Sequence, residues 1–175
     1  MQIYLSILSV IGGMMLMAVG SGMMTIFTPT VLGAAGFSTE LVGMVVTANA
    51  MGMFCSCFAG GWLIRRVGHI RAFSCYASLV VLAMLTLSQV ALLPLWLGLR
   101  FVTGFCTNSV FMVAQSWLNE AAPADKRGRI MSFFYVSYTL SLGGGAFLLT
   151  RIDVSDSLPY MVAAAFCCLA IVPVS

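Results

Sequence analysis

The sequence predicts an all-α membrane protein built as a bundle of six transmembrane helices. Of its 175 residues, 61% are hydrophobic and only 7% are charged, whereas a soluble domain has about 25% charged and about 45–50% apolar residues. The few charges divide the chain into six uncharged intervals, each able to supply the roughly 20 apolar residues of a spanning helix. A closed β-barrel needs alternating apolar and polar residues, and the run 79–87 does not alternate. The composition therefore excludes a soluble domain, a disordered segment and a nucleic-acid binder.

The charged positions set the limits of the expected helices. The first segment has no basic start, and its apolar run exceeds the about 7–15 residues of a signal peptide. We therefore expect a retained first helix, then a turn at Pro29 and an external loop containing Ala34 and Ala35. Within one domain of residues 1–175, the expected helices cover residues 3–27, 41–64, 71–93, 95–119, 130–150 and 158–174.

The basic residues predict the orientation in the membrane, because Lys and Arg concentrate in cytoplasmic loops. Three arginines lie in the segment 65–71 and three basic residues in the segment 126–129, whereas the opposite side has only Arg151, next to two aspartates. Both basic loops and both termini are therefore expected in the cytoplasm, in a multi-pass protein of the plasma membrane or bacterial inner membrane. Membrane-interface positions are expected for Trp62, Trp117 and Trp96.

Residues typical of metal or catalytic sites are scarce. The only histidine is His69, no Cys-x-x-Cys pair occurs, and all six cysteines lie inside expected helices, where they suit packing. No Asp or Glu lies in the middle of a span, and there is no paired carboxylate, phosphate loop or Ser-His-Asp set. We expect no enzyme activity, no catalytic residue, no metal and no cofactor.

The segment 95–119 carries polar and small residues along one helical face. On a helical wheel that starts at Arg100, this stripe contains Gly104, Thr107, Asn108, Phe111, Gln115, Leu118 and Asn119. One interpretation is a polar wall of a translocation path, in which Arg100 attracts an anionic group. The other is that Arg100 extends to the outer interface. The stripe favours the path, because the second interpretation does not explain Asn108 or Gln115.

Two other expected helices have small residues at four-residue spacing. These residues are Ala48, Gly52, Ser56 and Gly60 in the second helix, and Ser137, Ser141 and Gly145 in the fifth. Such faces let two helix backbones approach closely. Static packing is the favoured interpretation, and a surface along which two bundles slide is the alternative.

The two halves of the chain also correspond weakly, since residues 20–27 can be laid over residues 104–111. The loop from Gly61 to Arg71 resembles the loop 2–3 signature of the major facilitator superfamily, Gly-x-Leu-x-Asp-Arg-x-Gly-Arg-Arg. Arg100 with Gly104 resembles the family's Arg-x-x-x-Gly element, and the segment 120–129 resembles its helix 4–5 link. The resemblance implies a 3+3 inverted repeat and the N-terminal six-helix half of a twelve-helix transporter.

Two departures from the family pattern are visible. Arg65 stands where the signature has an acid, so Glu120 is expected to pair with Arg65, Arg66 or Arg71 at the inner side. The antiporter signature in the fifth helix ends in Gly-Pro, whereas a run of three glycines without proline occupies residues 143–145 here. This second departure weakens a drug/proton antiporter assignment.

The resemblance implies secondary active or facilitative transport of a small solute by alternating access. The alternatives are a non-transporting interaction module and a half-size transporter that associates with itself. Expected partners are the lipid bilayer, a small solute for which an anionic group would suit Arg100, and a second six-helix half, either a missing C-terminal part or a second copy. The expected cavity residues are Ser21, Thr25, Arg100, Asn108, Phe111 and Gln115, and the expected cytoplasmic gate residues are Gly61, Arg65, Arg66, Gly68, Arg71, Glu120 and Arg127.

Overall fold

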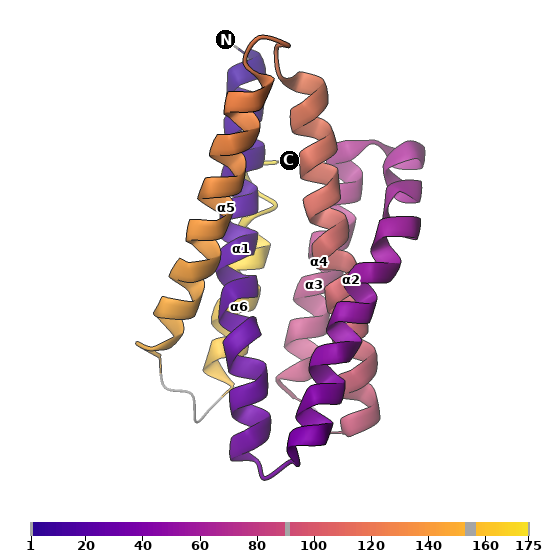
Figure 1. Cartoon of the computed structure of the whole chain (residues 1–175), viewed down its shortest axis with the longest axis vertical. Coiled ribbons are helices and arrows are strands. Elements are labelled where there is room, and N and C mark those ends of the chain that lie inside the picture. The colour runs from indigo at the N-terminus through magenta and orange to yellow at the C-terminus, as the bar shows by residue number, and fades with distance from the viewer. Residues whose placement is uncertain (1, 90–91, 153–156, 175) are drawn as a thin grey trace.

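The computed structural model describes residues 2–89, 92–152 and 157–174, and this part of the chain is a bundle of six helices (Figure 1). Five of the helices are long and apolar enough to cross a membrane. The sixth has 12 residues and is about 18 Å long, and hydrogen-bonded turns continue it to Val174. The helices are α1 (Gln2–Ala34), α2 (Thr39–Val67), α3 (His69–Leu87), α4 (Leu93–Ala121), α5 (Arg127–Leu149) and α6 (Leu158–Leu169).

The predicted turn at Pro29 is wrong, because α1 continues through this proline to Ala34. Proline leaves one helical carbonyl without its N–H donor, a loss that a long membrane helix tolerates. The chain turns out of the helix at Gly36, whose φ of +81° is a left-handed conformation that favours glycine. The N–H of Phe37 then donates to the carbonyl of Leu32, as in a Schellman motif.

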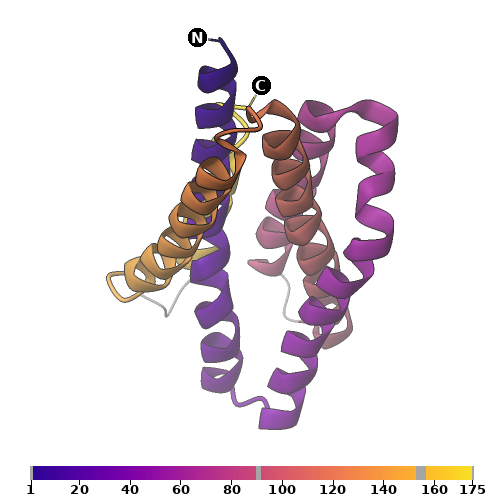
Figure 2. The same cartoon turned by 45° about the horizontal axis from the view of Figure 1, so that its top comes forward.

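The helices pack as two interlocked repeats of three. In both cartoons α1 lies along α5, and α2 lies along α4 (Figures 1 and 2). In such a repeat α1 is equivalent to α4, α2 to α5 and α3 to α6. The contact of α1 with α5 should then recur as a contact of α4 with α2, and the contact of α3 with α4 should recur as a contact of α6 with α1. The observed pairs follow this rule, so the expected inverted repeat is confirmed.

The contact between α2 and α4 depends on two glycines that face each other's helix. A Cβ added to Gly104 would collide with the carbonyl oxygen of Asn49, and a Cβ added to Gly52 would collide with that of Phe101. In each case the blocking carbonyl lies three residues before the partner glycine. Glycine therefore sets the close approach of the two backbones.

The contact between α1 and α5 has the same construction. A Cβ on Gly22 would meet the carbonyl of Leu142, and a Cβ on Gly145 would meet the carbonyl of Val19. Gly22 is thus the counterpart of Gly104, which corrects the sequence overlay that placed Gly20 on Gly104. Gly20 instead approaches the carbonyl of Ala163 on α6.

The small-residue faces are internal packing surfaces. Gly52, Ser56 and Gly60 are buried on α2, and Ser137, Ser141 and Gly145 are buried on α5. Both faces are covered by helices of this chain, as the static interpretation predicted. The opposite faces of α2 and α5 expose large apolar side chains, including Phe54, Phe58, Val136 and Leu140.

Candidate functional site

A cavity of about 190 Å³ lies where α1, α2, α4 and α5 meet. It includes the region of both glycine contacts, because Asn49, Gly104 and Leu142 contribute to its wall. The polar part of the wall consists of Ser21, Thr25, Asn49, Arg100, Thr103 and Thr107, and Tyr138 adds a phenol from α5. The apolar part includes three methionines, one each from α1, α2 and α3.

Arg100 is the charged residue of this cavity wall. Its side chain is only 6% exposed, and its guanidinium Nε has no hydrogen-bond partner among the described residues. Because α4 begins at Leu93, Arg100 lies two turns into the helix and faces the interior of the bundle. Burying a cation in a membrane protein is costly unless it faces a partner or a polar cavity. This placement differs from extension to the outer membrane interface.

The hydroxyl groups beside Arg100 are held by their own helices. Thr25 Oγ1 donates to the carbonyl of Ser21 at 2.9 Å, and Thr103 Oγ1 donates to the carbonyl of Leu99 at 2.7 Å. Each hydroxyl oxygen keeps lone pairs for a second interaction. The wall next to the arginine therefore offers fixed acceptors.

Of the six expected cavity residues, Ser21, Thr25 and Arg100 line the cavity, whereas the other three lie elsewhere. Asn108 faces α2, where its Nδ2 donates to Ser56 Oγ at 2.7 Å and to the carbonyl of Met53 at 3.2 Å. This amide joins two helices instead of facing open space. A helical wheel of α4 alone cannot show which residues of the stripe face the cavity and which face another helix. The position of the neighbouring helix decides which part of the stripe is covered.

Phe111 and Gln115 belong to an aromatic group between α4 and α5. The ring of Phe111 lies 4.8 Å from that of Tyr138 and 5.5 Å from that of Phe134. Gln115 Nε2 donates to the hydroxyl of Tyr135 at 2.5 Å. Tyr138 also lines the cavity, so the aromatic group lies between the cavity and the end of the bundle that carries the α4–α5 turn.

Sequence reasoning missed several wall residues, namely Met24, Asn49, Met53, Met84, Thr103, Tyr138 and Leu142. Asn49 had a signal, since it is a polar side chain near the middle of an apolar helix. The methionines had none, because a methionine is ordinary in any membrane helix. Only the packing of five helices shows which of the 13 methionines face the cavity.

Glu120 contacts His69 instead of the arginines expected for it. Its Oε1 lies 3.5 Å from His69 Nε2 and accepts a hydrogen bond from Ser116 Oγ at 3.2 Å. His69 Nε2 also lies 3.2 Å from Ser116 Oγ. His69 is the first residue of α3, and α3 packs along α4, so the start of α3 meets the end of α4.

The other expected gate residues lie around the α2–α3 turn and at the start of α5. Gly68 has a φ of +82° and separates α2 from α3. Arg66 lies over the ring of Trp62 at 4.3 Å. Arg65, Arg71 and Arg127 are exposed, and Gly61 is half-buried with Arg65 as its neighbour. Figure 1 shows the α2–α3 and α4–α5 turns at the same end of the bundle as the N-terminus.

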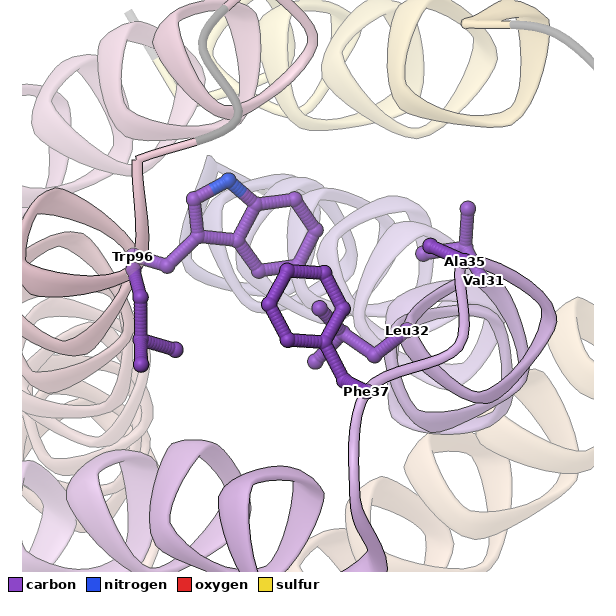
Figure 3. Close-up of a pocket in the computed structure, with 6 residues that line it drawn as sticks. Val31, Leu32, Ala35, Phe37 and Trp96 are labelled. Carbon is purple, nitrogen blue, oxygen red and sulfur yellow. The ribbon is translucent and has the colours of Figure 1, made fainter.

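A second pocket, of about 160 Å³, lies between the α1–α2 turn and the start of α4. The side chains of Leu32, Phe37 and Trp96 point toward one another across it (Figure 3). Trp96 is 8% exposed, so its ring packs inside the bundle near the start of α4, and its expected depth at the membrane interface stays a prediction. The lining is almost entirely apolar and includes no titratable group.

Metal-ligating residues do not gather anywhere in the described ranges. All six cysteines are free thiols, and only Cys106 and Cys167 are buried. The α3–α4 contact places Ser116 Oγ 3.2 Å from His69 Nε2, whereas the described lining of the cavity contains no histidine or carboxylate beside its hydroxyls. The polar groups of the cavity wall are one guanidinium, several hydroxyls and the amide of Asn49.

The fold and the cavity define a membrane-embedded helical bundle of the inverted-repeat kind found in secondary transporters. The comparison with protein families agrees with this class. The chain belongs to the Major Facilitator Superfamily, whose family model matches residues 10–174. The family resemblance noted in the sequence is thereby confirmed.

Curated proteins similar to the chain carry transporter names. It is 28% identical over 105 residues to "Putative metabolite transport protein YyaJ" of Bacillus subtilis (strain 168), covering 60% of this chain and 23% of that protein. It is 22% identical over 141 residues to "Uncharacterized MFS-type transporter YcaD" of Salmonella dublin, covering 81% of this chain and 37% of that protein. The chain thus matches well under half the length of these relatives.

Proposed function

We propose that this chain is the N-terminal six-helix half of a transporter that moves a small solute by alternating access. The observation that carries the proposal is the cavity at Arg100. There a buried guanidinium, whose Nε has no hydrogen-bond partner among the described residues, faces space between two pseudosymmetric helix pairs. Family membership and the transporter names of the relatives support the same function. The membrane is the plasma membrane or bacterial inner membrane, with both termini and both basic loops in the cytoplasm.

A second six-helix unit completes the path in this proposal. The exposed faces of α2 and α5 carry large apolar side chains along the length of the bundle, and either lipid or a second unit can cover them. The relatives are longer than the matched segment, which favours a further part of the same protein. A second copy of this chain is the other source.

The gate in this proposal is the end of the bundle that carries the basic loops. Contacts there join α3 to α4 through His69 and Glu120, and aromatic contacts join α4 to α5 through Phe111 and Tyr138. The remaining gate residues, Gly61, Arg65, Arg66, Gly68, Arg71 and Arg127, surround the α2–α3 turn and the start of α5. Closure at this end would separate the cavity from the cytoplasm.

Accessibility of the cavity from the two sides of the membrane tests the proposal. In a background without the six native cysteines, Thr107→Cys places one thiol on the cavity wall. A membrane-impermeant maleimide should label it from either side of sealed, oriented vesicles, because alternating access opens the cavity to each side in turn. Leu140→Cys is the control, since its exposed side chain on α5 should face lipid and remain unlabelled.

Labelling of Thr107→Cys from neither side would contradict transport and favour a non-transporting interaction module. If the thiol were labelled from one side of the membrane only under all conditions, the cavity would be a cleft that is permanently open to that side. That result would also contradict alternating access. Size-exclusion chromatography of both variants, before labelling, establishes that they are folded.

A further inference from the structure

The cavity wall carries a positive charge that the described part of the chain does not neutralise. Arg100 is buried, its Nε has no hydrogen-bond partner, and it has no carboxylate within ion-pair distance among the described residues. Within the described ranges the buried hydroxyl of Tyr160 on α6 also lacks a hydrogen-bond partner. The ring of Tyr160 packs against Trp96, one turn before Arg100. Neighbouring groups therefore leave the guanidinium available to the cavity.

We propose that the cavity binds an organic monoanion whose single negative group lies against Arg100 and whose body is apolar. The inference rests on the proposed function, since it names the substrate class of the same site. A buried cation is stabilised when an anion enters beside it. A cationic ligand would face repulsion at short range, and a neutral ligand would leave the arginine unpaired.

The rest of the wall explains why the body of the ligand is apolar. Met24, Met53, Met84 and Leu142 line the space together with the polar groups. Thioether side chains are flexible and polarisable, so they adapt to apolar bodies of different shape. The hydroxyls of Thr25 and Thr103 already donate to their own helices and do not supply free donors for a second anionic group.

The residues of the cavity wall also limit the ligand to a single negative charge. Arg100 is the cationic side chain that lines the cavity, and the methionines do not compensate a carboxylate. A second negative group would be buried without a second cation beside it, which is costly. The cavity therefore favours monoanions over dianions of the same length.

Four six-carbon probes of similar length test this inference with the protein in lipid nanodiscs at pH 7. They are hexanoate, the neutral hexanamide, the cationic hexylamine and the dianionic adipate. Ligand-observed saturation-transfer NMR measures each affinity, and empty nanodiscs correct for partition into lipid. Hexanoate should bind at least about tenfold more tightly than hexanamide, because hydrogen bonds to a charged group are stronger than neutral ones. Adipate and hexylamine should bind more weakly than hexanoate.

Variants assign the preference to one side chain. Arg100→Gln should lower hexanoate affinity to that of hexanamide, and Arg100→Lys should retain an intermediate preference, because lysine keeps the charge and loses the planar fork. The control is Arg151→Gln, since Arg151 is an exposed arginine that lies over Phe147 at 5.3 Å. Removing it should leave all four affinities unchanged.

Equal binding of hexanoate and hexanamide to the unmodified protein would overturn the inference, as would an Arg100→Gln variant that keeps the preference. Hexanamide binding by this variant shows that its cavity is intact. If the variant does not fold, the comparison of the four probes and the Arg100→Lys result decide. Failure of the inference is separate from failure of transport, because labelling of Thr107→Cys from both sides does not depend on ligand charge.

Discussion

The two glycine contacts of the bundle share one backbone arrangement but differ in their side chains. Gly22 on α1 and Gly104 on α4 occupy equivalent positions, and each meets a carbonyl of its partner helix. One residue before each glycine lies Ser21 or Thr103, and three residues after it lies Thr25 or Thr107. All four hydroxyl residues line the cavity, so the repeat supplies a pair of matched polar walls.

The difference begins four residues before each glycine. Arg100 occupies this position on α4, whereas Ala18 occupies it on α1 and is fully buried. The partner helices also differ in polarity at the contact. The carbonyl that meets Gly104 belongs to the polar residue Asn49, and the carbonyl that meets Gly22 belongs to the apolar residue Leu142. A symmetric backbone thus carries a charged residue on one of its two polar walls only. The proposed preference for a monoanion depends on this asymmetry.

The largest effect is expected from adding one methyl group at the glycine contacts. Gly104→Ala and Gly22→Ala should each destabilise the protein by about 1–3 kcal/mol, because the new Cβ collides with backbone that cannot rotate away. Thermal unfolding in detergent, followed by tryptophan fluorescence, measures the loss. Equal losses would show that the two contacts are equivalent in energy as well as in geometry.

Gly144→Ala is the matched control on α5, because nothing lies within 4 Å of a Cβ added there. It should be neutral or slightly stabilising, since alanine is favoured over glycine inside a helix. Loss of stability in this control as large as in Gly104→Ala would contradict the assignment of the effect to the close backbone approach.

The sequence predicted the number and order of the helices well, because charges are costly inside a membrane and mark the turns. Pro29 was misleading, since its lost hydrogen bond matters less in a long helix than in a short soluble one. The packing of Trp96 was not predictable, because a position near a helix end does not show that Phe37 and Tyr160 enclose the ring. The position of a residue along its own helix was predictable from the sequence. The residues that surround it depend on how the other helices pack.

The candidate site was predictable to a similar degree. Arg100 stood out because it lies within an otherwise uncharged segment. The overlay of the two repeats was shifted by two residues, because Gly20 and Gly22 are both glycines and only the contact with α5 distinguishes them. The side chains that Asn108 and Glu120 contact on other helices were not predictable. The sequence does not specify how those helices are rotated about their axes.

A smaller effect is expected from the polar contact that occurs in only one of the two helix pairs. Asn108 donates to Ser56 across α2 and α4, whereas the equivalent residue on α1 is the exposed Ile26. Asn108→Leu should destabilise the protein by about 0.6 kcal/mol, the average for side-chain hydrogen bonds between membrane helices, and by no more than the maximum of about 1.7 kcal/mol. Ile26→Leu is the control and should change stability by less than about 0.5 kcal/mol.

A double-mutant cycle with Ser56→Ala assigns this energy to the pair. If the two single changes are independent, their effects on the free energy of unfolding add, and the hydrogen bond contributes nothing measurable. That result would leave the glycines as the main source of α2–α4 stability. It would also make the two helix pairs energetically alike.

The smallest effect is expected where α4 ends, at the contact between Glu120 and His69. The equivalent position after α1 is Ser38, which instead accepts a hydrogen bond from the N–H of Leu41 at the start of α2. Glu120 has a side chain that is 66% exposed, so water and salt weaken its attraction to His69. Glu120→Gln should therefore lower stability by less than about 1 kcal/mol.

The measurement for Glu120→Gln is the unfolding temperature in low salt and in 0.5 M NaCl. A difference that disappears in high salt indicates an electrostatic contact, and a difference that persists indicates that the hydrogen bond from Ser116 carries it. If Glu120→Gln destabilised the protein as much as Gly104→Ala does, the end of α4 would hold the bundle together as strongly as the glycine contacts do. The glycine contacts would then not be the main source of the stability of the bundle.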